Sequence, residues 1–347
     1  MKTKSKSINH AAGESFGGIV CAGTILLMAA SAPGQNLFVT SCINPGSIYQ
    51  ITPSGAVSTF TATGQNYPYG LAFDSAGDLF VANCLDDSGI GGYVTEITPG
   101  GVQSTIPSGP DPKGLAIDSA GDLFETDYHS GNIYEYTPGG VLSIFATVTP
   151  APQAMAFNSA GDLFVGTGYG NGNESITEIT PNGTQSTFVA SGLSYIGGLA
   201  FNSAGDLFEA DNGSGHIYEF SPGGVKTTFA SGLSPGGLAF NSAGDLFEAD
   251  GSGNIYEFSP GGVQSTFASG LNAPVGLAFQ GVALPVPEPS VFGLLVAGVS
   301  ALLVRLFVGG TRRSEEKRSI ANGEFWMGWS GCSEGMESCQ SCLTAFA

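Results

Sequence analysis

The sequence repeats itself about every 40 residues, and this period limits the fold more than any other feature. The tetrapeptide Ser-Ala-Gly-Asp occurs five times, and its glycines are spaced by 44, 40, 44 and 39 residues: Gly77, Gly121, Gly161, Gly205 and Gly244. That spacing is typical of the four-stranded blades of a β-propeller. Because no 3.6-residue apolar period occurs inside the repeats, we predict an all-β fold.

One repeat, read from Gly198, predicts four short strands over residues 198–201, 206–211, 216–221 and 225–229. The turn between the first two has the residue types of a type I turn that ends in positive φ. The third strand alternates Ile, Tyr, Glu and Phe, and Pro222 with two glycines favours a hairpin into the fourth.

A sixth copy of the repeat is split between the two ends of the repeat region. Residues 276–279 supply a first strand with nothing after it, whereas residues 37–41, 47–52 and 56–60 supply the other three strands without a first one. Pairing these segments would close a ring of six blades and remove its exposed sheet edges. The sequence therefore predicts a six-bladed β-propeller over residues 35–284, closed by its terminal strands.

The repeat also resembles a known pattern. Residues 237–240 read Gly-Leu-Ala-Phe, residues 244–250 read Gly-Asp-Leu-Phe-Glu-Ala-Asp, and Asn-Ile-Tyr follows at 254–256. This resembles the NHL repeat and the wider group of six-bladed propellers that includes gluconolactonase-like and virginiamycin-lyase-like proteins. The resemblance implies the fold; it does not select an activity, because such propellers include enzymes, binding modules and scaffolds.

The predicted propeller is strongly acidic. Residues 35–284 contain 13 Asp and 9 Glu against two cations, Lys113 and Lys226, so the formal charge is +2 − 22 = −20. This charge argues against nucleic acid or an anionic membrane surface as a partner of this domain. It is typical of a surface kept soluble by acid, and we expect a monomer.

Polar residues recur where the second strand of each blade ends. Because strands alternate in direction, these positions should share one face of the disc: Ser41, Asn83, Asp127, Thr167, Asp211 and Asp250. We expect the carboxylates to accept hydrogen bonds from nearby backbone. The alternative is a Ca²⁺ or polar-ligand site formed by Asp127, Asp211 and Asp250, since Ca²⁺ prefers converging oxygen ligands.

Signals for catalysis are weak, and we name no catalytic residue. His129 and His216 stand without a partner motif, and His216 takes a position held by Asn in sister repeats. An acidic or amide residue recurs on every third strand, which indicates blade architecture instead of one active site: Gln50, Glu96, Glu135, Glu178, Glu219 and Glu257.

The cysteines leave one question open. Cys42 and Cys84 occupy equivalent loops of adjacent blades, where a disulfide requires Cα atoms within about 7 Å. Cys339 and Cys342 have metal-like spacing, but no second pair or histidine accompanies them, so we do not expect zinc.

The first 34 residues have the layout of a secretory signal peptide. Lys2, Lys4 and Lys6 precede an apolar run over residues 16–30, and small residues follow it. Cleavage after Ala32 or after Gly34 both fit the sequence, and an uncleaved anchor is the alternative.

Residues 285–318 combine three elements in order. The motif Val286, Pro287, Glu288, Pro289 precedes an apolar run from Val291 to Val308, which a basic cluster follows: Arg312, Arg313, Lys317 and Arg318. Together they resemble a PEP-CTERM sorting signal, which exosortases of Gram-negative bacteria process. This implies an inner-membrane precursor that is delivered to the cell envelope or outside, with an extended spacer over residues 284–290. Residues 319–347 form an atypical tail that such signals lack, and we expect it to be disordered.

These observations predict an exported propeller with a non-catalytic binding or matrix role, in contact with extracellular polysaccharide. The alternative is a lactonase-like or lyase-like enzyme that uses the face with Asp127, Asp211 and Asp250, with Ca²⁺ as its cofactor.

Overall fold

A computed structural model describes residues 34–61, 64–84, 91–168, 170, 172 and 174–281 of the chain. The predicted signal peptide, sorting motif, apolar run, basic cluster and tail lie outside these residues. Within these ranges no helix is long and apolar enough to cross a membrane.

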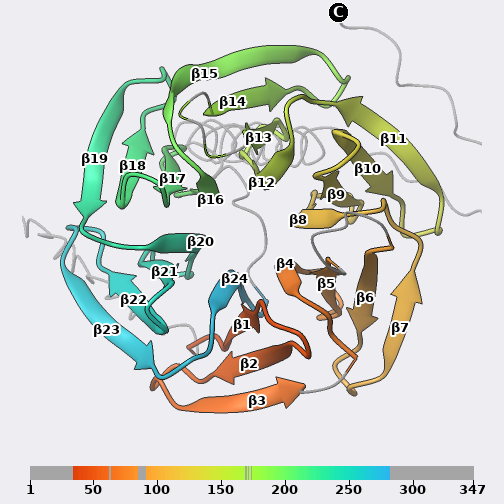
Figure 1. Cartoon of the computed structure of the whole chain (residues 1–347), viewed down its shortest axis with the longest axis horizontal. Helices are drawn as coiled ribbons and strands as arrows, with labels where there is room; N and C mark the ends of the chain where they lie inside the picture. Colours follow the sequence, from red (N-terminus) through yellow and green to blue (C-terminus); the bar gives the residue numbers. More distant parts are fainter. Residues whose placement is uncertain are drawn as a thin grey trace, which may run out of the picture. The chain divides into compact units, whose positions relative to one another are not determined.

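Six four-stranded antiparallel sheets stand around a central axis as the blades of a propeller (Figure 1). Blade 1 consists of β24 (Pro274–Phe279), β1 (Leu37–Ser41), β2 (Ser47–Ile51) and β3 (Val57–Thr61). Blade 2 consists of β4 (Pro68–Phe73), β5 (Leu79–Asn83), β6 (Tyr93–Ile97) and β7 (Gln103–Ile106). Blade 3 consists of β8 (Pro112–Ile117), β9 (Leu123–Asp127), β10 (Asn132–Tyr136) and β11 (Leu142–Thr147). Blade 4 consists of β12 (Pro152–Phe157), β13 (Leu163–Thr167), β14 (Glu174–Ile179) and β15 (Gln185–Leu193). Blade 5 consists of β16 (Ile196–Phe201), β17 (Leu207–Asp211), β18 (His216–Phe220) and β19 (Lys226–Ser231). Blade 6 consists of β20 (Pro235–Phe240), β21 (Leu246–Asp250), β22 (Asn254–Phe258) and β23 (Gln264–Ser269).

The predicted six-bladed closure is confirmed. β24 pairs with β1 in antiparallel register, with Leu37 opposite Phe279 and Val39 opposite Leu277, and the sheet order is β24-β1-β2-β3. The first strands begin two residues earlier than the sequence suggested; β16 starts at Ile196, which pairs with Asp211 around an irregularity in the register.

The repeated tetrapeptide forms the turn between first and second strands. In blade 5, Asn202 Oδ1 accepts the N–H groups of Ala204 at 2.9 Å and Asp206 at 2.8 Å, and Gly205 has φ +87°. An Asn or Asp side chain that bonds backbone two residues on is the driving interaction of such turns, and glycine adopts the positive φ without steric cost. This explains the conserved composition of the turn from one repeat to the next.

Aromatic side chains join neighbouring blades at five of the six seams, and in the seam of blades 2 and 3 Phe80 packs with Ile106 and Ile117 instead. Phe208 of β17 meets Phe229 of its own blade edge-to-face, with ring centroids 5.0 Å apart, and Phe240 of blade 6 at 5.1 Å. Equivalent trios are centred on Phe38, Phe124, Phe164 and Phe247. The core therefore lies in the seams between blades, where edge-to-face pairs add to the burial of apolar surface.

The two faces of the disc are built from different connections. We call upper the face where first strands start and second strands end, and lower the face with the Ser-Ala-Gly-Asp turns and the hairpins between third and fourth strands. The lower connections repeat closely, whereas the upper ones vary in length and residue type.

Candidate functional site

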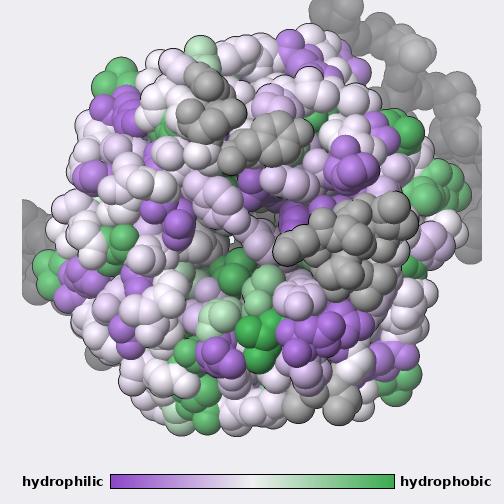
Figure 2. Space-filling view, viewed as in Figure 1, coloured by the Kyte–Doolittle hydropathy of each residue, from purple (hydrophilic) through white to green (hydrophobic). Residues whose placement is uncertain are grey.

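The second residue of each first strand makes the upper mouth of the central channel asymmetric. Large polar residues occupy this position in the neighbouring blades 2, 3 and 4, and small ones occupy it in blades 5, 6 and 1: Tyr69, Lys113 and Gln153, then Gly197, Gly236 and Val275. Figure 2 shows this face hollowed at its centre, with hydrophobic surface over β24 beside the hollow. A repeated fold thus carries a single, unrepeated set of side chains around its axis.

Lys113 is the hub of this set. Its Nζ atom lies 3.5 Å from the Asp111 carboxylate, 5.3 Å from the ring centroid of Tyr69 and 5.5 Å from that of Tyr128. An ammonium within about 6 Å of an aromatic ring is attracted by the ring's quadrupole. The lysine is therefore held by three partners from blades 2 and 3, while its side chain stays partly open to solvent.

The Tyr69 side chain of blade 2 interacts with a tyrosine on the opposite side of the channel. Tyr195, in the segment that leads into blade 5, lies near enough to Tyr69 of blade 2 to raise the pKa of its phenol, and its own side chain is 41% exposed. Because blades 2 and 5 face each other across the axis, this pair spans the channel mouth. Burial, with Tyr195 and the nearby thiols, raises the pKa of Tyr69 well above its usual value.

Two thiols lie beside the lysine. Cys42 and Cys84 are both free, so the structure shows no disulfide between them. Cys84 Sγ donates to the Pro112 carbonyl at 3.0 Å, and burial raises its pKa to about 12 despite the opposing effect of Lys113. Burial also raises the pKa of Cys42. Both groups are therefore neutral thiols near neutral pH.

The three aspartates predicted on this face accept hydrogen bonds from backbone. Asp127 accepts the N–H groups of Asp111 at 2.7 Å and Ser130 at 2.6 Å. Asp211 accepts the N–H groups of Ser194 at 2.8 Å and Ser214 at 2.9 Å. Asp250 accepts those of Ser234 and Ser252, both at 2.8 Å. Each carboxylate thus ties the upper ends of two strands together.

The structure does not bring Asp127, Asp211 and Asp250 to one point, since each is bonded within its own blade. Among the described residues, no group of three or more His, Cys, Asp or Glu side chains is placed to hold a metal ion.

Sequence reasoning missed a buried glutamate two residues before each of these aspartates. Glu125, Glu209 and Glu248 lie in the middle of their second strands with no exposed surface. Glu125 is satisfied by Tyr136 Oη, which donates at 2.5 Å, and by the Gly109 N–H at 3.0 Å. The oxygens of Glu209 and Glu248 have no hydrogen-bond partner among the described residues.

Burial raises the pKa of all three carboxyls. The pKa of Glu125 rises to about 7, because its two donors offset part of the cost of burial. That of Glu248 rises to about 8, with Asp250 adding to the effect of burial. The Gly236 N–H approaches Glu248 and opposes the shift, but it does not reach hydrogen-bond geometry. Burial, with a further contribution from Asp211, also raises the pKa of Glu209. The signal in the sequence was a Glu inside an otherwise mainly apolar strand, preceded by Phe and followed by Ala or, for Glu125, by Thr.

The remaining candidates lie apart from the channel mouth or are structural. His216 stacks on Tyr218 with ring centroids 5.4 Å apart, and its Nδ1 lies 3.0 Å from Ser214 Oγ, on the outer half of blade 5. His129 is exposed on the upper loop of blade 3. The recurring third-strand glutamates accept from a serine on the fourth strand, as in the pairs Ser104–Glu96, Ser143–Glu135 and Ser186–Glu178.

Comparison with known proteins places the fold. By sequence, no family model matches this chain and no curated protein matches it. By structure, it is similar to virginiamycin B lyase from Staphylococcus aureus, with a TM-score of 0.51, 15% identity, and coverage of 72% of this chain and 90% of that one.

Two further structures give the same result. A gluconolactonase candidate matches with a TM-score of 0.52, 15% identity, and coverage of 63% and 87%. The calcium-binding protein regucalcin from Agrobacterium tumefaciens matches with a TM-score of 0.53, 17% identity, and coverage of 62% and 78%. The chain is thus a six-bladed β-propeller whose structural neighbours are of the lactonase and lyase type. At these identities the similarity concerns the fold alone.

Proposed function

We propose that this protein is an exported, non-catalytic binding propeller that holds a polar ligand at the upper mouth of its channel. The asymmetric hollow supplies a cation at Lys113 and aromatic surface at Tyr69 and Tyr195. Sugars bind proteins through such a combination of ring faces and polar groups, and an acidic sugar would also use the lysine. Extracellular polysaccharide is therefore the ligand class that we favour.

The observation that carries this proposal is the unrepeated set of Lys113, Tyr69 and Tyr195 at the mouth, and the protonation of the groups there supports it. Burial lowers the pKa of Lys113, but the adjacent Cys84 and Asp111 outweigh it, so the net shift is upward. The pKa values of Cys84 and Tyr69 are also raised. At neutral pH the lysine stays charged while the thiol and phenol stay protonated. General acid–base catalysis needs a group that titrates near the working pH, and these three do not.

The two lysines of the propeller provide a matched test. Lys226 also lies over a tyrosine ring, 3.5 Å from the centroid of Tyr218, but on the outer part of blade 5. In calorimetric titrations with neutral and uronic-acid oligosaccharides, Lys113→Met should weaken binding at least about tenfold, which corresponds to roughly 1.4 kcal/mol. Lys226→Met should leave the affinity unchanged. Equal effects of both substitutions would mean that general charge, not the channel mouth, binds the sugar.

The rival function is a lactonase-like or lyase-like enzyme on the same face, and the structural neighbours are the observation that favours it. Within this set His129, exposed on the upper loop of blade 3 and near Asp111, is the side chain to test for proton transfer. Sustained turnover of a sugar lactone that His129→Ala abolishes would establish the enzyme and reject our proposal.

We also propose that the sequence outside the propeller is an address: a signal peptide over residues 1–34 and a PEP-CTERM segment over residues 285–318. Support comes from the order of the Pro-Glu-Pro motif, the apolar run and the basic cluster. In a host with an exosortase, the mature protein should lose the segment beyond the motif and leave the inner membrane, whereas Glu288→Ala should remain there at full length. Intact mass and membrane fractionation distinguish the two; identical behaviour would indicate a plain anchor.

A further inference from the structure

The outer strand of blade 3 departs from the repeat at two exposed positions. Leu142 and Ile144 of β11 are 42% and 58% exposed. At the position of Ile144 the other five blades all carry Thr, and at the position of Leu142 they carry Gln, Lys or Val. The equivalent pairs are Val57 and Thr59, Gln103 and Thr105, Gln185 and Thr187, Lys226 and Thr228, and Gln264 and Thr266. Blade 3 therefore exposes two large aliphatic side chains where the other blades are mainly polar.

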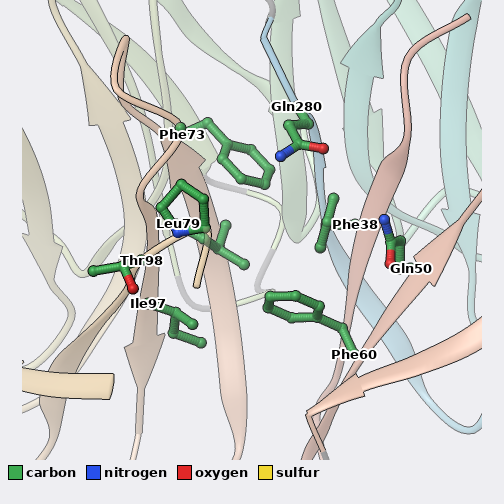
Figure 3. A pocket seen from close by; sticks show the side chains of 10 residues that line it. Phe38, Gln50, Phe60, Phe73, Leu79, Ile97, Thr98 and Gln280 are labelled. Atoms are coloured by element: carbon green, nitrogen blue, oxygen red, sulfur yellow. The ribbon is translucent and has the colours of Figure 1, made fainter. Parts of the chain in front are cut away.

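These two side chains do not belong to the core of the disc. Figure 3 shows the part that a fourth strand gives to the core: Phe60 of β3 points into the crevice between blades 1 and 2. Phe145 has this role in blade 3, where its ring lies 5.1 Å from that of Phe124. Leu142 and Ile144 stay exposed, and neighbouring exposed apolar side chains of this kind mark interaction surfaces.

The outer side of β11 is also an open sheet edge. β11 is the last strand of its sheet and lies on the rim of the disc in Figure 1, and no described strand pairs with its outer side. The Thr137 N–H donates to the Val141 carbonyl at 3.0 Å, and Thr137 Oγ1 accepts the Val141 N–H at 3.2 Å, so both backbone groups of Val141 point inward. Because this direction alternates along an antiparallel strand, the backbone groups of Leu142 and Ile144 point outward.

This strand is complementary to a second copy of itself. When two copies of β11 run antiparallel about a two-fold axis at Ser143, Leu142 of one copy lies opposite the partner's Ile144, and Ile144 lies opposite the partner's Leu142. The outward N–H and C=O groups then bond across the axis, and the four aliphatic side chains share one face of the joined sheet. We propose that this protein forms a symmetric dimer through the outer edges of β11, so that blade 3 of each copy becomes half of one continuous sheet.

Charge and symmetry favour a second copy as the occupant of this edge. Residues 137–161 contain no charged side chain, so the two strands bring no acid of their own together. The two-fold pairing uses the edge of each copy once, and the assembly therefore closes at a dimer instead of growing into a fibre.

The dimer should be weak and reversible. The register of β11 against β10 shifts after Ile144, so regular pairing spans only about five residues and covers less than the roughly 1,200–2,000 Å² of a stable interface. We expect a dissociation constant on the order of 10–100 µM.

Sedimentation equilibrium of the full chain measures the association. Leu142→Gln with Ile144→Thr installs the residues of blades 2, 4 and 6, so it should keep the fold and weaken dimerisation at least about tenfold. The control Val263→Thr removes a valine that is 71% exposed on the rim of blade 6 and installs the residue that blade 4 carries there, and it should leave the dimer unchanged. Association through any other part of the chain would be common to all three proteins. A monomer at every concentration up to about 1 mM would overturn the proposal, as would equal association of the wild type and the double variant.

The salt dependence of the same measurement separates an apolar contact from charge pairing. Each propeller carries a formal charge of −20, which opposes the approach of two copies and is screened over about 10 Å at 0.1 M salt. Raising the salt from about 0.05 M to about 0.5 M should therefore strengthen the dimer several-fold. Association that weakens over this range would contradict pairing through β11.

A designed disulfide tests the two-fold register. In Ser143→Cys the two thiols face each other across the axis, because opposite residues of an antiparallel pair have Cα atoms about 4.5–5.5 Å apart, within the range of a disulfide. Ser265→Cys is the control at the same position of blade 6. Under mild oxidation, Ser143→Cys should give at least about tenfold more covalent dimer than Ser265→Cys, after subtraction of the background from the unsubstituted chain. Equal yields would overturn the proposal even if the double variant fails to fold.

Discussion

The seams between blades and the mouth of the channel differ in whether their side chains repeat from blade to blade. In five of the six seams the same aromatic side chains return, as in the trio of Phe208, Phe229 and Phe240, and these copies make the same contacts. At the mouth, Lys113 occurs once, and its sister positions carry Tyr, Gln, Gly or Val. What repeats holds the disc together, and what does not repeat is available to recognise a ligand. Substitutions at the two kinds of position should therefore separate stability from binding.

The largest effect is expected where the repeat closes on itself. Deleting residues 273–283 removes β24 and leaves β1 as an exposed edge, so the whole ring should lose cooperative thermal unfolding. Val275→Gly, a control at the unrepeated second position of the same strand, where blades 5 and 6 carry glycine, should leave the cooperative transition intact. Calorimetry checks both; an unchanged melting transition after the deletion would contradict closure by β24.

An effect of intermediate size is expected on the pH dependence of stability, because the folded pKa values of the buried glutamates differ between blades. Glu248 has a folded pKa raised to about 8, so it binds its proton more tightly in the folded state than in the unfolded one. Its contribution to stability is complete below about pH 4.5 and is lost as pH rises through about 8. Glu248→Gln should therefore flatten the decline in stability over this range by an amount on the order of a few kcal/mol.

Glu125→Gln is the matched comparison. The folded pKa of Glu125 is about 7, and Tyr136 and Gly109 donate to its carboxylate. Its pH-dependent contribution should therefore end about one unit lower and be smaller. Denaturant unfolding at several pH values measures both variants; the same pH profile in wild type and Glu248→Gln would show that the carboxyl is hydrated and not buried.

The smallest effect is expected for the aspartates that close the upper ends of the strands. Asp211→Asn with Asp250→Asn should lower stability by about 1–3 kcal/mol, since an amide keeps one acceptor and loses the other. Asn83 shows this state in blade 2, where its Oδ1 accepts from the Asn66 N–H at 3.1 Å. Millimolar Ca²⁺ should leave the melting temperature of the wild type unchanged. A rise that disappears in the double variant would instead identify a calcium site.

The sequence predicted the ring because its determinants are local. The Asn202 turn and the hairpin at Pro222 depend on residues within four positions of each other, so each repeat reveals its own strands. The start of the first strand was missed by two residues, because the prediction began at Gly198 whereas Ile196 and Gly197 also belong to β16.

The channel mouth could not be predicted in this way. Tyr69, Lys113 and Tyr195 come from blades 2, 3 and 5, and the ring arrangement is what brings Tyr195 to the other two across the axis. Their one signal was variation at a position flanked by constant residues. The glutamates were equally hidden, because burial of the strand from both sides, not its alternation, determines their surroundings.

The pairing of β1 with β24 also determines when this chain can fold. The Gly276 N–H donates to Thr40 Oγ1 at 2.8 Å across 236 residues of sequence, so this contact waits for nearly the whole propeller to be made. Contacts of such long sequence separation slow folding, since the entropy of closing the loop is lost before any contact is gained. Blades 2 to 6 each consist of consecutive strands and can assemble as synthesis proceeds, but blade 1 stays incomplete until its last strand arrives. The row of blades therefore stays open for most of synthesis, and the pairing of β24 with β1 closes it into a ring.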